Sequence, residues 1–301
     1  MKWTLLLGLP LVACGPPARQ GMSGDDQPTP DALQPDSPAP VIDGPDNCSE
    51  AAKHAYVVDQ DNTLSTFTPP GTFADLGVLN CSSSSTPFSM GVDRNAMAWV
   101  LYADGTLYNV DLNTLPLTCT HTAWQPGNLG NQVFGMGFST DVSGGDTDTL
   151  YIAGGQAFAA GAHAQLSSLD LATSPIGSIA IGTDLLPGWP ELTGNSLAEL
   201  WGFFPSADGS TPTQVGRIDK DTATVDPIYS FPGLGGGLSP SAWAFAFYGG
   251  TYYMFLATGS NTVVYAMDEN GTLESTTGTQ TTRNIVGAGV STCAPIVVGR
   301  Q

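Results

Sequence analysis

The chain has 301 residues, of which 27 are Asp or Glu and only 8 are Lys or Arg, so its formal net charge is −19. A surface of this sign repels phosphate backbones, which excludes nucleic acid as an electrostatic partner. The 37 glycines, the 23 prolines and a charged fraction of only 12% predict short strands joined by many turns.

The chain begins with the pattern of a secretory leader. Lys2 precedes a short apolar run that extends from Thr4 to Ala13 and is too short for the roughly 20 residues that a helix needs to cross a bilayer. The run ends in the four letters LVAC, the last of which is Cys14. Residues 1–13 are therefore predicted to be a signal peptide that is cleaved before Cys14.

The LVAC segment resembles the lipobox of bacterial lipoproteins. This resemblance implies that the thiol of Cys14 and the new amino group carry acyl chains such as palmitate. Two or three acyl chains bury enough methylene groups to hold a soluble domain at a membrane. In enterobacteria an Asp after this cysteine retains the protein at the inner membrane, and Gly15 stands there instead. We therefore expect an exported protein that is anchored in the cell envelope, at the outer membrane.

Residues 14–47 are dense in Pro, Asp and Gly and contain few apolar side chains. Such a composition cannot bury enough surface to offset the entropy lost on ordering. We expect a disordered, partly polyproline spacer between the lipid and a folded domain at residues 48–301. A Pro-rich recognition motif is the alternative role for this segment.

Residues 48–301 repeat with a period of roughly 40 to 60 residues, a spacing typical of stacked repeat architectures. One unit runs from an apolar strand at 88–92 through a second strand at 98–103, an Asp104-Gly105 hairpin signal and a third strand ending in Asp111 to a fourth strand at 115–120. In the last complete unit the fourth strand is expected at 272–276. Similar first strands read FGMGF at 134–138, LTG at 192–194 and AFAF at 244–247.

The third strand of each unit ends in an aspartate. We expect these side chains to accept hydrogen bonds from nearby backbone amides and so to close the turn into the fourth strand. A ring of ligands is the alternative function. The four residues are Asp111, Asp170, Asp219 and Asp268.

A further unit is complete only when the two ends of the domain are joined. Strands are expected at 55–59, 63–67 and 73–79, with no first strand before them, whereas an isolated first strand is expected at 285–290. This arrangement resembles a β-propeller, in which a shared blade closes the ring. The prediction is an all-β fold of about five four-stranded blades, closed by the C-terminal strand.

Four cysteines remain once Cys14 is assigned to lipid, an even number that predicts two disulfides in an exported chain. Ring closure favours a bond between Cys48 and Cys293, which flank the shared blade. Cys81 and Cys119, at the outer strands of neighbouring units, would then form the second bond.

Two further groups of residues are candidate binding sites. The turn that holds Asp141, Asp146 and Asp148 carries the carboxylates that a structural calcium ion would need, although a solvated turn is the simpler interpretation. Trp124 and Trp189 lie in connections that contain Pro and Gly, and they are the tryptophans expected on an exposed ligand-binding surface.

The sequence contains no G-x-S-x-G nucleophile elbow. The expected inner strands contain almost no ionisable side chains, and Asp93 and Glu191 are the nearest exceptions. No cofactor other than calcium is indicated. We therefore predict a non-catalytic binding or scaffold module for an envelope protein or polysaccharide. The alternative is a propeller-type hydrolase or lactonase with a metal ion at the axis.

Overall fold

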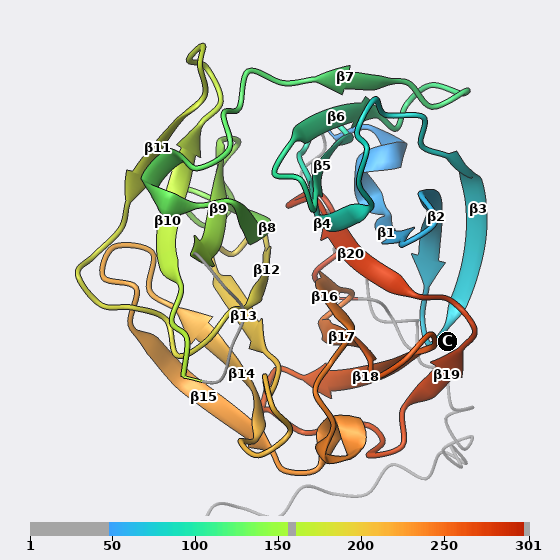
Figure 1. Cartoon of the computed structure of the whole chain (residues 1–301), viewed down its shortest axis with the longest axis vertical. Coiled ribbons are helices and arrows are strands. Elements are labelled where there is room, and N and C mark those ends of the chain that lie inside the picture. Colours follow the sequence, from blue (N-terminus) through green and yellow to red (C-terminus); the bar gives the residue numbers. More distant parts are fainter. Residues whose placement is uncertain (1–47, 156–160, 298–301) are drawn as a thin grey trace, which may run out of the picture. The chain divides into compact units, whose positions relative to one another are not determined.

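The computed structural model describes residues 48–155 and 161–297 (Figure 1). The predicted signal peptide, Cys14 and the spacer at residues 14–47 lie outside the described residues. Among those that are described, no helix is long and apolar enough to cross a bilayer. Three short 3-10 turns occur, at Glu50–Lys53, Asn128–Gly130 and Leu234–Gly237.

The described strands form five antiparallel sheets of four strands each, arranged as blades around one axis (Figure 1). Four blades follow one another along the chain, with the first strand of each at the axis. These blades are β4 (Pro87–Val92), β5 (Met97–Tyr102), β6 (Leu107–Asp111) and β7 (Cys119–His121); β8 (Val133–Thr140), β9 (Asp148–Gly155), β10 (Gln165–Asp170) and β11 (Gly177–Ala180); β12 (Glu191–Gly194), β13 (Leu200–Phe204), β14 (Thr213–Ile218) and β15 (Val225–Phe231); β16 (Ala242–Tyr248), β17 (Thr251–Ala257), β18 (Thr262–Asp268) and β19 (Thr279–Thr281).

The fifth blade is shared between the two ends of the domain, as predicted. Its strands are β20 (Ile285–Val290), β1 (Ala55–Asp59), β2 (Thr63–Thr68) and β3 (Thr72–Val78), in that order from the axis outward. β20 pairs with β1 in an antiparallel register that places Ala55 opposite Val290. The predicted five-bladed propeller closed by a C-terminal strand is therefore confirmed.

Both predicted disulfides are present. Cys48 is bonded to Cys293 across the shared blade, with Cα atoms 5.9 Å apart, and Cys81 is bonded to Cys119 with Cα atoms 5.1 Å apart. The first bond joins the two ends of the ring covalently, so the shared blade is held by backbone hydrogen bonds and by a crosslink.

The inner strands are buried on both faces, which explains their apolar and glycine-rich sequences. β20 is buried at every position, and β8 at every position but its first. At Gly135 of β8, an added Cβ would lie only 2.0 Å from the carbonyl oxygen of Pro190, which precedes β12. At Gly287 of β20 it would lie 2.9 Å from the backbone nitrogen of Met90 in β4. Only glycine permits inner strands to approach this closely.

The aspartates at the ends of the third strands close turns, as predicted. Asp111 Oδ1 accepts a hydrogen bond of 2.9 Å from the backbone amide of Asn113. Asp268 Oδ1 accepts bonds from the amides of Asn270 and Thr272, at 3.0 and 2.8 Å. Asp170 and Asp219 make the corresponding bonds to Ala172 and Asp221.

Two outer strands differ from the prediction. The fourth strand expected at 115–120 is β7 (Cys119–His121), because Pro116 has no amide hydrogen with which to begin a ladder. The fourth strand expected at 272–276 is β19 (Thr279–Thr281), and only Leu273 makes an isolated bridge before it. The intervening residues are polar, so no apolar alternation fixes their register.

Candidate functional site

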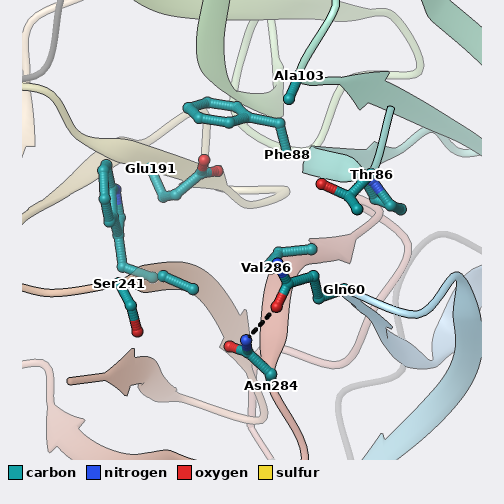
Figure 2. A pocket seen from close by; sticks show the side chains of 11 residues that line it. Gln60, Thr86, Phe88, Ala103, Glu191, Ser241, Asn284 and Val286 are labelled. Carbon is teal, nitrogen blue, oxygen red and sulfur yellow. Dashed lines mark hydrogen bonds between the residues drawn. The ribbon is translucent and has the colours of Figure 1, made fainter. Parts of the chain in front are cut away.

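A cavity of about 130 Å³ lies at one end of the propeller axis. Its wall includes residues at the starts of four inner strands, namely Phe88 of β4, Glu191 of β12, Ala242 and Trp243 of β16, and Val286 of β20. Figure 2 shows Glu191 and Phe88 on one side of this space and the joined side chains of Gln60 and Asn284 on another. The propeller thus brings together residues far apart in the sequence, since Gln60 and Asn284 are separated by 224 positions.

Glu191 is the only ionisable residue among the described residues that line the cavity. Its side chain is buried, with 2% exposure, and its Oε2 accepts a hydrogen bond of 2.8 Å from the hydroxyl of Ser89 in β4. Burial raises the pKa of Glu191 well above its usual range, although hydrogen bonds from Ser89 and from the backbone of Met136 oppose this effect. None of the described lining residues is Lys, Arg or His.

The remaining wall combines two aromatic rings with two amides. The centroids of Phe88 and Trp243 are 6.5 Å apart in an edge-to-face arrangement. Asn284 Nδ2 donates to Gln60 Oε1 at 2.5 Å, whereas Asn284 Oδ1 is buried and has no hydrogen-bond partner among the described residues. The cavity therefore offers an apolar surface, a carboxyl group and side-chain amides.

A larger recess of about 680 Å³ adjoins the cavity, and the two share Gln60, Thr86 and Asn284. Three aspartates and one arginine line this recess. Arg283 Nη1 donates to Asp59 at 2.7 Å, and Nη2 of the same guanidinium pairs with Asp75. The third aspartate, Asp61, leaves the approach to the cavity with a net negative charge.

The opposite end of the axis is built differently. Asp148, at the start of β9, receives hydrogen bonds from Arg94 Nε at 3.1 Å and from Arg94 Nη2 at 2.9 Å. The hydroxyl of Thr292 donates to the same carboxylate at 2.6 Å. Cys293, which is bonded to Cys48, follows Thr292 directly. This end therefore supplies its buried carboxylate with a partner from within the chain.

The predicted calcium ligands are not brought together. Asp148 is engaged by Arg94, Asp141 Oδ1 accepts from the hydroxyl of Thr149 at 2.7 Å, and Asp146 is exposed. Across the described residues, no group of three or more His, Cys, Asp or Glu side chains is placed to hold a metal ion. Instead, the ion pair between Asp148 and Arg94 connects this turn to the β4–β5 connection.

Trp124 and Trp189 are buried, with exposures of 1% and 5%, so the expectation that they are exposed is wrong. Trp124 packs edge-on against Phe134, with centroids 5.4 Å apart. Large aromatic rings stabilise a propeller more by filling the space between blades than by remaining in solvent. Trp189 does border a separate hollow of about 300 Å³, which Phe204 and Pro205 also line.

The sequence identified one residue of the axial cavity, Glu191, and missed the amides. Asp93, the other exception noted in the sequence, accepts from the backbone of Met97 and from the indole of Trp99, so it orders a turn. Gln60 and Asn284 lie just beyond β1 and just before β20. Ring closure is the sequence signal that places these two residues side by side. Where the ring closes, the backbone amide of Gln60 donates to the backbone carbonyl of Asn284 at 2.9 Å.

No protein-family profile matches the chain, and no curated protein does. Several solved structures are similar to it. The Dos1 propeller has 13% identity and a TM-score of 0.41 over 72% of this chain and 53% of that one, about half of its length. TolB from Acinetobacter baumannii has 13% identity and a TM-score of 0.40, covering 78% of this chain and 66% of that chain. A catalytically inactive virginiamycin B lyase from Staphylococcus aureus, with quinupristin, has 15% identity and a TM-score of 0.38 over 75% and 70%.

Proposed function

We propose that this protein is an exported, lipid-anchored module of the cell envelope that binds part of an envelope protein or polysaccharide at one end of its propeller axis. The axial cavity is the observation that carries this proposal. Its wall is assembled from four inner strands and presents a carboxyl group, two amides and two aromatic rings. Concave sites with apolar walls and a few convergent polar groups are typical of ligand binding.

The size of the cavity limits what it holds. A cavity that holds one water molecule needs a volume of about 10–15 Å³. The axial cavity, at about 130 Å³, therefore accommodates a side chain or one end of a sugar but not a polymer. The rest of a partner would lie over the recess and the neighbouring loops. This arrangement suits a module that captures a projecting group of a larger envelope component.

The alternative function, a hydrolase or lactonase with a metal ion at the axis, would need a set of metal ligands there. A catalytic zinc site uses three protein ligands and one open position. The cavity offers the single carboxylate of Glu191 and amide oxygens from Gln60 and Asn284. We therefore derive no catalytic step through a metal ion. Turnover of esters or lactones that is lost in Glu191→Gln would replace the binding function by an enzymatic one.

The proposed anchor is supported by the LVAC segment that ends at Cys14 and by the two disulfides, which are typical of exported proteins. It is tested by fractionating cells that express the full chain or Cys14→Ser. The wild type is expected in the membrane fraction, with acyl chains detected on Cys14 by mass spectrometry. An unacylated wild-type Cys14, or Cys14→Ser in the membrane fraction, would contradict the anchor.

The binding function is tested by blocking the cavity. Ala103 is exposed at its mouth, so Ala103→Trp adds a large ring there with little effect on packing. Ala172→Trp is the matched control, because Ala172 is exposed in the β10–β11 turn. The full-length variants, held in lipid vesicles, are titrated with purified cell-wall polysaccharide and with solubilised envelope proteins. A tenfold loss confined to Ala103→Trp is expected, and equal binding by both variants would refute the proposal.

A further inference from the structure

We propose that the group bound in the axial cavity is a cation, an ammonium or a guanidinium group, and that the Glu191 carboxylate is its counter-ion. This inference rests on the proposed binding function and names the chemical class of its ligand. A lysine or arginine side chain of a partner protein and a free polyamine share this chemistry.

The first support comes from the buried carboxyl groups of the ring. Asp148 and Asp59 are each paired with an arginine of the chain, Arg94 and Arg283. Glu191 is more deeply buried than Asp59, yet no cation is among the described residues that line its cavity. Buried charges in proteins are paired, so the fold prepares a position for a positive group without providing one.

The hydrogen bonds of Glu191 indicate that the site is arranged for a carboxylate. The hydroxyl of Ser89 donates to Glu191 Oε2, and the backbone of Met136 also bonds this side chain. Both donors favour the charged form, but burial outweighs them in the free protein. A cation that enters the cavity supplies the missing stabilisation and shifts the balance toward the carboxylate.

The aromatic wall and the acidic recess point to the same ligand. The cavity wall also holds the rings of Phe88 and Trp243, and the face of an aromatic ring attracts a cation within about 6 Å of its centroid. The recess carries Asp59, Asp61 and Asp75 against the single Arg283. With a net charge of −19 on the chain, this field attracts cations toward the mouth of the cavity.

The pH dependence distinguishes a cation from a neutral hydrogen-bond acceptor. Glu191 is hydrogen-bonded by Ser89 of β4 and Met136 of β8, and the charged groups of the adjoining recess are Asp59, Asp61, Asp75 and Arg283. A lysine-type ammonium stays charged up to about pH 10. Its binding must release the Glu191 proton, so affinity rises up to tenfold per pH unit and levels off above the pKa of the free protein. A neutral group that can only accept a hydrogen bond, such as a carbonyl oxygen, needs the protonated acid and binds more weakly as the pH rises.

The test is calorimetric titration of the full chain with Nα-acetyl-lysine amide and with the same compound acetylated on Nε. We expect a Kd on the order of 1 mM for the amine and binding at least tenfold weaker for the acetylated compound. Glu191→Gln, which keeps the shape of the side chain, is expected to weaken amine binding at least tenfold. Glu269→Gln, which removes an exposed carboxylate, is expected to change it less than twofold.

A second measurement needs only the wild-type protein. Titrations at pH 5.5 and pH 8, in buffers of different ionisation enthalpy, are expected to show tighter amine binding at pH 8 and proton release at pH 5.5. Putrescine is compared with a lysine-containing peptide to separate the two sources. Tighter binding of the peptide would indicate a protein partner, and tighter binding of putrescine would indicate a free polyamine.

Two sets of results distinguish a failure of the cation inference from a failure of the proposed binding function. If N-acetylglucosamine binds and the amine does not, or if affinity falls as the pH rises, the cation inference is overturned and the binding function stands. If the amine does not bind and Ala103→Trp also leaves binding of envelope material unchanged, both fail.

Discussion

The two ends of the propeller axis both contain a buried carboxyl group, and they stabilise it by different means. At the closed end, which Arg94, Asp148, Thr292 and the Cys48–Cys293 disulfide define, the carboxylate receives three hydrogen bonds from two side chains. At the open end, which the cavity around Glu191 defines, the carboxyl group is bonded by Ser89 and by the Met136 backbone, neither of which carries a charge.

This difference separates a structural role from a functional one. A carboxylate with its own arginine is complete within the chain and contributes to the closure of the ring. A carboxyl group without a counter-ion costs free energy in the unliganded protein, and a bound cation would recover that free energy. The comparison therefore predicts that variants at the closed end change stability, whereas variants at the open end change binding.

The largest effect is expected for Arg94→Met, which leaves Asp148 buried without its partner. Removing one member of a buried ion pair lowers the free energy of unfolding by about 3–5 kcal/mol, measured by urea denaturation at pH 7. Glu191→Gln, at the open end, is expected to be at least as stable as the wild type, because it retains an acceptor for Ser89 and removes a buried acid. Similar losses in the free energy of unfolding of both variants would contradict the proposed difference between the two ends.

The next largest effect is expected for the disulfide of the closed end. The Cys48–Cys293 bond joins residues 245 positions apart, whereas the Cys81–Cys119 bond spans 38. Because a crosslink restricts the unfolded chain more when the loop is longer, Cys48→Ser with Cys293→Ser is expected to cost about 2–4 kcal/mol. Cys81→Ser with Cys119→Ser should cost less. Thermal unfolding of both double variants checks this order, which a greater loss in the second would reverse.

A pH-dependent effect is expected at the open end. Burial raises the folded-state pKa of Glu191 above the value of about 4.3 for an unfolded Glu. Between these two pKa values the folded state holds more protons, so the free energy of unfolding falls as the pH rises, by about 1.4 kcal/mol for each unit of separation. Glu191→Gln has no carboxyl group at this position, so its free energy of unfolding lacks this pH dependence. Urea denaturation from pH 4 to pH 8 should therefore show the wild type losing stability relative to the variant, and parallel curves would contradict the assignment.

The smallest effect is expected for Asp61→Asn in the recess. Its charge contributes to the field outside the cavity and makes no ion pair among the described residues. The association rate of the lysine probe is expected to fall about twofold at low salt and to be unchanged at 0.5 M salt, where exposed charges are screened. Stopped-flow measurements check this, and a loss that persists at high salt would place Asp61 in direct contact with the ligand.

Much of the fold could be predicted from the sequence. Apolar first strands, Asp-Gly hairpins in two of the units and aspartates at the ends of four third strands are local signals, and they recur because each blade packs its strands in the same way. The incomplete units at the two ends form one blade only if the ring is closed. Ring closure in turn favours one of the three possible pairings of the four cysteines. The predictions failed where the signal was weak, in the polar outer strand near Thr279 and in the exposure of Trp124 and Trp189.

The site depended on distances that no sequence pattern contains. The sequence shows Glu191 as an ionisable residue on an apolar strand, but Ser89, which donates a hydrogen bond to it, lies 102 positions away. Asp148 is a neighbour of Asp141 and Asp146 in the sequence, which predicts a shared site, whereas the structure pairs it with Arg94, 54 positions earlier. The sequence by itself determined the repeat and its closure, because these follow from local patterns, and it predicts lipid attachment at Cys14. Only the tertiary structure decided which buried carboxyl group has a counter-ion, because the free energy of a buried charge depends on the strands that surround it.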